Sequence, residues 1–123
     1  TSSLPVTGMA RDVREPGRVA GFHFFNPVDR MPLVEVVRAE GTSDGTIERM
    51  VAFARRLAKV PVVVRDSPGF LVNRLFLPYM KEAFRLLEEG ADPRAIDHAM
   101  VAFGMPMGPL TLIDRASAPV RSK

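Results

Sequence analysis

A change in hydrophobic pattern near Asp66 constrains the fold more than any other feature of the sequence. Before it, short runs of β-branched and aromatic residues predict strands, and apolar residues spaced by three and four predict one amphipathic helix. After it, only the helical spacing continues. The predicted strands cover residues 21–25, 33–37 and 60–64, and the predicted helices cover 46–59, 70–89, 93–104 and a short segment after 109. We therefore predict an α/β portion, residues 1–66, followed by an all-α portion, residues 67–123.

Several capping and turn residues mark the ends of these elements. Ser43 is a suitable N-cap for the first helix, and Asp92 precedes Pro93 in the order that starts a helix. The order Ser-Pro-Gly at 67–69 likewise predicts the start of the long helix, which Gly90 ends. Pro61 restricts the third strand to a strand start or a sheet edge.

Composition limits the class of protein. The chain has 123 residues, of which 46% are hydrophobic and 25% charged, and these values are typical of a globular protein. Cysteine is absent, which excludes disulfides and cysteine nucleophiles, and the histidines and acids show no metal-ligand spacing. The apolar runs are too short to span a membrane, and the net charge of +3 comes from scattered basic residues. We therefore expect no metal, no membrane span and no nucleic-acid partner.

The nine glycines do not form a phosphate-binding turn. None of them fits G-x-G-x-x-G or a Walker A loop, so the chain has no dinucleotide-binding fingerprint of its own. The chain begins at Thr1 without an initiator methionine. We expect it to be a piece of a longer polypeptide.

Two titratable residues within predicted strands are candidates for chemistry. His23 lies among the aromatic residues of the first strand, and Glu35 lies in the middle of the apolar second strand, where a carboxylate needs a partner. A short connection joins these strands, so we expect them to be neighbours and Glu35 to reach the imidazole. A carboxylate bound to an imidazole fixes its tautomer and makes it a general base. A structural ion pair, or a Glu35 exposed at a sheet edge, explains the same pattern equally well.

Three other polar residues are candidates with less support. Asn26 follows the first strand, where open α/β sheets often bind a ligand, but Asn-Pro is also an ordinary turn pair. Asn73 interrupts the apolar face of the long helix and must bind either a backbone group or a ligand. Ser2 carries no signal from the pattern alone, and His98 is expected on the surface.

Five segments, in order along the chain, resemble the 3-hydroxyacyl-CoA dehydrogenase family. They are T-S-S-L at 1–4, G-F-H-F-F-N-P-V at 21–28, L-V-E-V-V at 33–37, D-S-P-G-F-L-V-N-R at 66–74 and F-G-M-P-M-G-P at 103–109. The resemblance covers nearly the whole chain. The segment D-R-M-P at 29–32 is most similar to that of the bacterial multifunctional fatty-acid oxidation proteins.

The resemblance implies a fold, a reaction and a set of residue roles. The fold is the C-terminal part of a Rossmann-like NAD-binding domain joined to the start of a helical C-terminal domain. The reaction is the NAD-dependent oxidation of an L-3-hydroxyacyl-CoA to a 3-ketoacyl-CoA in fatty-acid β-oxidation, in the cytoplasm. By the family pattern the catalytic pair is His23 and Glu35, the cofactor contacts are Asn26 and Ser2, and the acyl-CoA contacts are Ser2 and Asn73.

The chain departs from the family at both ends. The glycine-rich cofactor turn is absent, and residues 115–123 do not follow the family. We therefore expect a fragment that is inactive alone, from a parent that acts as a homodimer or within a multienzyme complex. The alternative is a non-catalytic fragment that serves only for folding or dimerisation, through the Met- and Phe-rich faces of its helices.

Overall fold

The computed structural model describes residues 4–117, which form two compact units that divide between Arg74 and Leu75. The boundary predicted between residues 66 and 67 is a different division and stays a prediction. Within the described residues no helix is long and apolar enough to cross a membrane. In chain order the elements are α1 Val6–Ala10, the 3-10 helix η1 Pro16–Arg18, β1 Gly21–Phe24, β2 Leu33–Arg38, α2 Asp44–Arg56, β3 Val60–Arg65, α3 Val72–Glu88, α4 Pro93–Phe103 and α5 Pro109–Ser117.

The first unit is built on a three-stranded sheet with the order β1-β2-β3. β1 pairs antiparallel with β2, and β2 pairs parallel with β3. The central position of β2 leaves its residues 34–37 fully buried, and each buried valine stabilises the fold by about 1.5–3 kcal/mol relative to an exposed one. Because β3 lies at an edge of this sheet, the prediction from Pro61 is confirmed.

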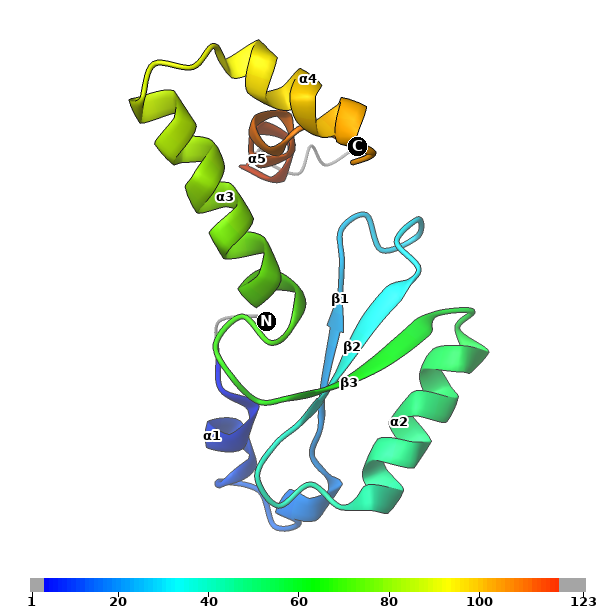
Figure 1. The fold of residues 1–123 in the computed structure, drawn as a ribbon. Coiled ribbons are helices and arrows are strands. Elements are labelled where there is room, and N and C mark those ends of the chain that lie inside the picture. The colour runs from blue at the N-terminus through cyan, green and yellow to red at the C-terminus, as the bar shows by residue number, and fades with distance from the viewer. Residues whose placement is uncertain (1–3, 118–123) are drawn as a thin grey trace. The chain divides into compact units, whose positions relative to one another are not determined.

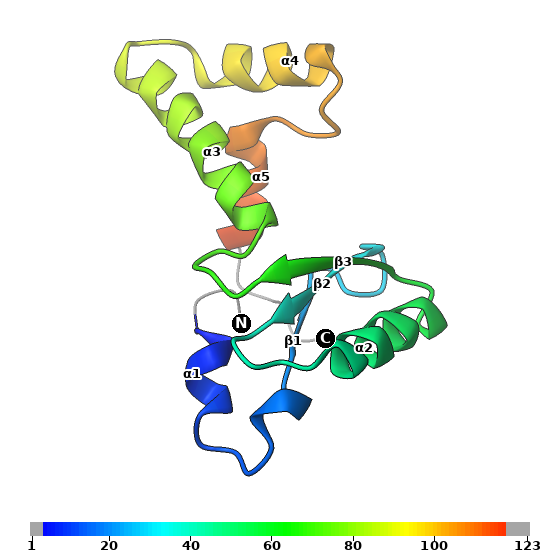
Figure 2. The same cartoon turned by 60° about the horizontal axis from the view of Figure 1, so that its bottom comes forward.

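The two faces of the sheet carry different side chains because successive strand residues point to opposite sides. On one face Phe22 of β1 packs against Phe53 of α2, with ring centroids 5.7 Å apart. On the other face Val37 of β2 joins Val6 of α1 in a buried apolar cluster. Figure 1 and Figure 2 show α1 and α2 on opposite sides of the sheet. The sheet therefore has a face covered by α2 and a face on which α1 covers only one end.

The capping residues predicted for α2 and α4, and the glycine predicted to end α3, are confirmed. The hydroxyl of Ser43 accepts a hydrogen bond from the backbone N–H of Thr46 and caps α2. The carboxylate of Asp92 accepts hydrogen bonds from the first N–H groups of α4. Gly90 and Gly104 follow α3 and α4 with φ values of 91° and 119°, which favour glycine.

The main differences from the sequence prediction concern the helices. The helix α3 begins at Val72 rather than residue 70, because Gly69 and Phe70 both have positive φ and cannot continue a right-handed helix. The helix α2 ends at Arg56 rather than residue 59, since Ala58 has a φ of 57°. The helices α1 and η1 are absent from the prediction, because five and three residues are too few to show a periodicity.

In the second unit a carboxylate joins α4 to α5. Asp97 of α4 accepts hydrogen bonds from the backbone N–H groups of Leu110 and Thr111 at 2.8 and 2.9 Å, and from the Thr111 hydroxyl at 2.6 Å. These bonds satisfy donors in the first turn of α5, which that helix cannot satisfy itself. A Cβ atom on Gly108 would overlap Asp97, so the close approach requires glycine.

Replacing Asp97 with alanine is expected to lower the free energy of unfolding of the helical unit by about 1–2 kcal/mol, the usual effect of a lost N-terminal cap. The hydrogen bond from the Thr111 side chain lowers the pKa of Asp97, burial opposes it, and the N–H groups of Leu110 and Thr111 lower it further. Because the folded state has the lower pKa, this stabilisation is present above the ordinary value of 3.8 and disappears as the pH falls through the folded value.

Urea unfolding at neutral pH and at a pH below that ordinary value checks this prediction. The difference between wild type and Asp97→Ala should be large at neutral pH and should shrink in acid. The exposed Asp114 on α5 provides the matched control, and Asp114→Ala should change the free energy of unfolding by less than about 0.5 kcal/mol. Equal effects of the two substitutions would contradict the role of Asp97.

Candidate active site

His23 and Glu35 face each other directly across β1 and β2. The antiparallel register pairs these two residues, so both side chains emerge on the same face of the sheet. Nδ1 of His23 lies 2.7 Å from Oε2 of Glu35. The contact predicted from the sequence is confirmed. The alternative of an exposed Glu35 is wrong, because this residue is fully buried in the central strand.

Glu35 has three hydrogen-bond donors around its carboxylate. Besides His23 on Oε2, the backbone N–H groups of Leu71 and Val72 both donate to Oε1, each at 2.9 Å. The N–H groups at the start of a helix favour a negative charge, and α3 begins at Val72. A carboxylate without partners in a central strand would be strongly destabilising. The three donors explain how the sheet accommodates this charge.

The donors also determine where the imidazole carries its proton. A carboxylate only accepts hydrogen bonds, so Nδ1 of His23 donates to Glu35. In a neutral ring Nε2 then carries the lone pair. The His23 side chain keeps 17% of its surface exposed, whereas the Glu35 side chain keeps 1%. The pair therefore has a buried end at the carboxylate and an accessible end at the imidazole.

A tight turn before α3 directs the two N–H groups at Glu35. The carbonyl oxygen of Ser67 accepts a hydrogen bond from Phe70 N at 2.8 Å, with Pro68 and Gly69 at the central positions. Gly69 has a φ of 74°, and proline followed by such a glycine is typical of a type II turn. Phe70 has a φ of 44°, a left-handed conformation that costs a non-glycine residue about 1–2 kcal/mol. Such a conformation persists only where the surroundings fix it.

Two phenylalanine rings pack against the imidazole. The ring centroid of Phe25 lies 4.8 Å from that of His23, and the centroid of Phe70 lies 5.6 Å away, both in edge-to-face geometry at 62°. Apolar surroundings strengthen a hydrogen bond such as the one between His23 and Glu35. Neither phenylalanine is predicted from the sequence as part of the site. The available signal was the Pro-Gly pair at 68–69, which favours a type II turn as well as a helix start.

Asp66 fixes the chain segment that leads into this turn. Its two carboxylate oxygens accept hydrogen bonds from Val6 N and Thr7 N at 3.2 and 2.7 Å. Burial alone raises the pKa of Asp66, but hydrogen bonds from Thr7 and Val6 outweigh it and leave the pKa below its ordinary value. The carboxylate thus ties the start of α1 to the segment between β3 and α3.

Of the other predicted site residues, two lie in described segments and one does not. Asn26 is exposed two residues after β1 ends. Asn73 is partly buried in the first turn of α3, next to Gly69. Ser2 lies outside the described residues. His98 is exposed on α4, as predicted.

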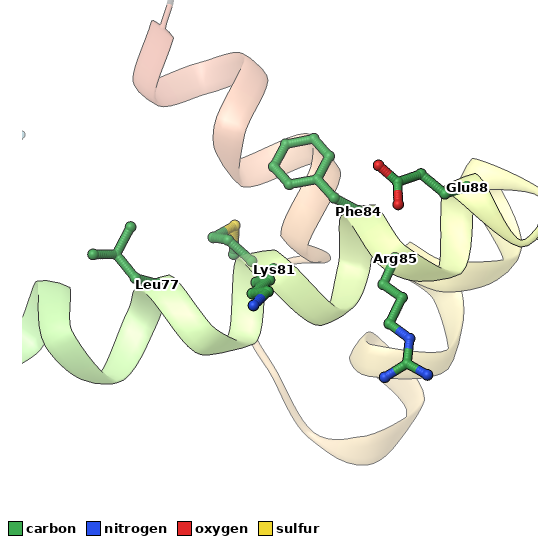
Figure 3. Close-up of a pocket in the computed structure, with 6 residues that line it drawn as sticks. Leu77, Lys81, Phe84, Arg85 and Glu88 are labelled. Carbon is green, nitrogen blue, oxygen red and sulfur yellow. The ribbon is translucent and has the colours of Figure 1, made fainter.

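A hollow on α3, in the second unit, has a different character. It has a volume of about 410 Å³, and Figure 3 shows that its labelled side chains come from successive turns of one helix. Its lining mixes apolar groups with ions, namely Leu77, Met80, Lys81, Phe84, Arg85 and Glu88. None of these groups forms a buried acid–base pair. The candidate active site is therefore the pair His23 and Glu35.

The fold and this pair define a class of protein, an α/β domain with a carboxylate-bound histidine in its sheet, joined to a helical domain. Comparison with known proteins gives the family. The model of the 3-hydroxyacyl-CoA dehydrogenase NAD binding domain matches residues 1–67, and that of the C-terminal domain matches residues 69–123. The second match includes residues 115–123, so the expectation that these residues do not follow the family is wrong. The chain belongs to the 3-hydroxyacyl-CoA dehydrogenase family. Its fold is accordingly the C-terminal part of a Rossmann-like NAD-binding domain followed by the start of the helical domain.

Individual relatives agree with this family. The chain is 48% identical over its whole length to the fatty acid oxidation complex subunit alpha of Idiomarina loihiensis, of which it spans 17%. It is similar to the crystal structure of (S)-3-hydroxybutyryl-CoA dehydrogenase from Ralstonia eutropha, with a TM-score of 0.90, 44% identity, and coverage of 94% of this chain and 42% of that one. For 3-hydroxybutyryl-CoA dehydrogenase from Escherichia coli K12 the TM-score is 0.91 and the identity 45%, with coverage of 94% and 25%.

NAD is the cofactor of this family, and the chain's residues fit one part of it. The imidazole of His23 is partly exposed and Asn26 is exposed, so both are accessible to a ligand. The glycine-rich turn that binds a dinucleotide diphosphate does not occur anywhere in the 123 residues. The chain therefore carries a candidate base but not the diphosphate-binding turn.

Proposed function

We propose that this chain supplies the catalytic base of an NAD-dependent L-3-hydroxyacyl-CoA dehydrogenase, which oxidises a 3-hydroxyacyl-CoA to a 3-ketoacyl-CoA in fatty-acid β-oxidation. The observation that supports this function most directly is the 2.7 Å hydrogen bond between His23 Nδ1 and Glu35 Oε2, which leaves the Nε2 lone pair for a substrate. Family membership, shown by the two matching domain models, supports the same reaction.

The geometry indicates how His23 handles a proton. Nε2 of His23 accepts the proton of the C3 hydroxyl as the C3–H electron pair leaves with its hydrogen as hydride and a C3 carbonyl forms. When bound, NAD accepts this hydride. The buried carboxylate of Glu35 stabilises the imidazolium, because its negative charge lies against Nδ1. The ring later releases its proton to water.

We extend the proposal to three residues that would position the reactants. Asn26 would contact NAD near its nicotinamide, Ser2 would contact substrate and cofactor, and Asn73 would contact the acyl-CoA near its thioester. Asn73 directly follows Val72, whose N–H binds Glu35, and this sequence neighbourhood supports a contact close to the reacting carbon. The division into an NAD-binding portion, 1–66, and a helical portion, 67–123, is part of the same proposal.

Two measurements test the proposed function. We expect the 123-residue chain to be inactive alone, because it lacks the glycine-rich turn, and calorimetric titration should detect no micromolar affinity for NAD. A chimera in which the chain replaces the matching residues of the Idiomarina loihiensis relative should oxidise a 3-hydroxyacyl-CoA and form NADH. A chimera that binds NAD without oxidising this substrate would contradict the function. Micromolar binding by the chain alone would contradict the expected lack of NAD affinity.

A purely structural piece for folding or dimerisation is the second candidate, and exposed apolar side chains favour it. Leu75, Leu77 and Phe84 of α3 are 69%, 63% and 48% exposed, and Phe103 of α4 is 81% exposed. We propose that these side chains contact further protein in a cytoplasmic homodimer or multienzyme complex. Activity of the chimera would show that the chain does more than mediate such contacts.

A further inference from the structure

We propose that Phe70 is a positioning residue for the base, since its ring fixes the imidazole of His23 and its left-handed backbone fixes the carboxylate of Glu35. The catalytic consequence rests on the proposed function. The geometric part rests on contacts within residues 21–72 and is testable without any activity.

The ring of Phe70 limits how the imidazole can rotate. Phe70 is 4% exposed, so its ring is held in the core of the first unit, and its centroid lies 5.6 Å from that of His23. With Phe25 at 4.8 Å, two phenyl rings pack against the imidazole in edge-to-face geometry. An imidazole that turned about its Cβ–Cγ bond would lose both contacts and would carry Nδ1 away from Glu35.

The backbone of Phe70 directs the donors on the other side of the carboxylate. Leu71 and Val72 come directly after it, and both donate to the same oxygen of Glu35 at 2.9 Å. Their direction follows from two successive residues with positive φ, Gly69 at 74° and Phe70 at 44°. A right-handed φ at position 70 would turn these N–H groups away. One residue therefore acts on both members of the pair.

The presence of a phenylalanine, rather than a glycine, at position 70 indicates what its side chain contributes to the site. A left-handed position suits glycine best, because glycine has no Cβ atom to oppose this conformation. Phe70 nevertheless occupies such a position, next to a glycine that already closes the turn. The ring packs in the buried apolar cluster of the first unit, and its contact with His23 makes the same packed ring a support for the orientation of the base.

Imidazole nitrogen NMR of the complete 123-residue chain tests this inference. The chain has only two histidines, and the exposed His98 serves as an internal reference. We expect wild-type His23 to populate one tautomer, with the proton on Nδ1, while His98 exchanges between two. Phe70→Leu and Phe70→Met should give His23 a mixture of tautomers, and Phe70→Tyr, which keeps the ring, should restore one. Phe53 packs on the opposite face of the sheet, so Phe53→Leu is the matched control and should leave the tautomer of His23 unchanged.

The same variants in the chimera test the catalytic consequence. Phe70→Leu should lower kcat by about 10- to 100-fold, as the loss of a group that orients a functional residue does, with little change in KM. An unchanged tautomer and an unchanged kcat in Phe70→Leu would overturn the inference. A wild-type His23 without a preferred tautomer would also overturn the inference. That measurement does not depend on whether the leucine and methionine variants fold. If the tautomer responds to Phe70 but the unsubstituted chimera is inactive, the role of Phe70 stands and the proposed function fails.

Discussion

Replacement of His23 by glutamine is expected to lower kcat of the chimera by about 10²- to 10⁴-fold, the range that a general base contributes. Glutamine matches the reach of histidine, but its amide does not accept a proton at neutral pH. The base takes its proton only as the transition state forms, so KM should change little. Steady-state rates of NADH formation with a 3-hydroxyacyl-CoA measure both constants.

The second histidine supplies the control for this substitution. His98 is exposed on α4, and His98→Gln makes the same chemical change outside the predicted site. It should leave kcat unchanged. The amide of glutamine at position 23 can still donate to Glu35 Oε2, so the His23 variant should keep its fold by circular dichroism. An unchanged kcat in a folded His23→Gln chimera would remove His23 as the base.

The contact between His23 and Glu35 could be predicted because strand periodicity and a short connection are local properties. Each residue lies in an apolar run that predicts a strand. The short connection between the two runs makes the strands antiparallel neighbours and determines their register. A carboxylate in an apolar run requires a partner, and His23 on the neighbouring predicted strand is a candidate for it. The strands, the caps of α2 and α4 and the three later helices follow from signals of the same local kind.

The surroundings of this pair could not be predicted because they depend on contacts distant in sequence. The donors on Oε1 of Glu35 come from residues 36 and 37 positions further along the chain. Their direction depends on the φ of Phe70, and no pattern predicts a left-handed phenylalanine, which is unfavourable unless its surroundings fix it. The Ser-Pro-Gly order at 67–69 starts many helices, but in this structure it forms a turn. The sequence prediction therefore placed the start of α3 two residues too early.

Glu35 allows a sharper experiment than removal of its charge, because leucine and glutamine at this position disrupt different bonds. Glu35→Leu removes every acceptor and leaves the N–H groups of Leu71 and Val72 without a partner in a buried place. The free energy of unfolding should fall by about 2–6 kcal/mol, because each buried donor left without a partner costs about 1–3 kcal/mol. Urea unfolding measures this loss, and Glu48→Gln on the exposed part of α2 is the control that should not change stability.

Glu35→Gln should instead preserve the fold and inactivate the base. The amide oxygen can accept both N–H groups of the α3 start, but its NH₂ group then faces Nδ1 of His23. Two donors cannot face each other, so the imidazole must carry its proton on Nε2 and accept at Nδ1. Nε2 then has no lone pair for the C3 hydroxyl, and kcat should fall by about 10²- to 10⁴-fold. Imidazole NMR should show the exchanged tautomer in the folded variant. A variant that keeps both the Nδ1 proton and the wild-type rate would show that Glu35 does not set the tautomer of His23.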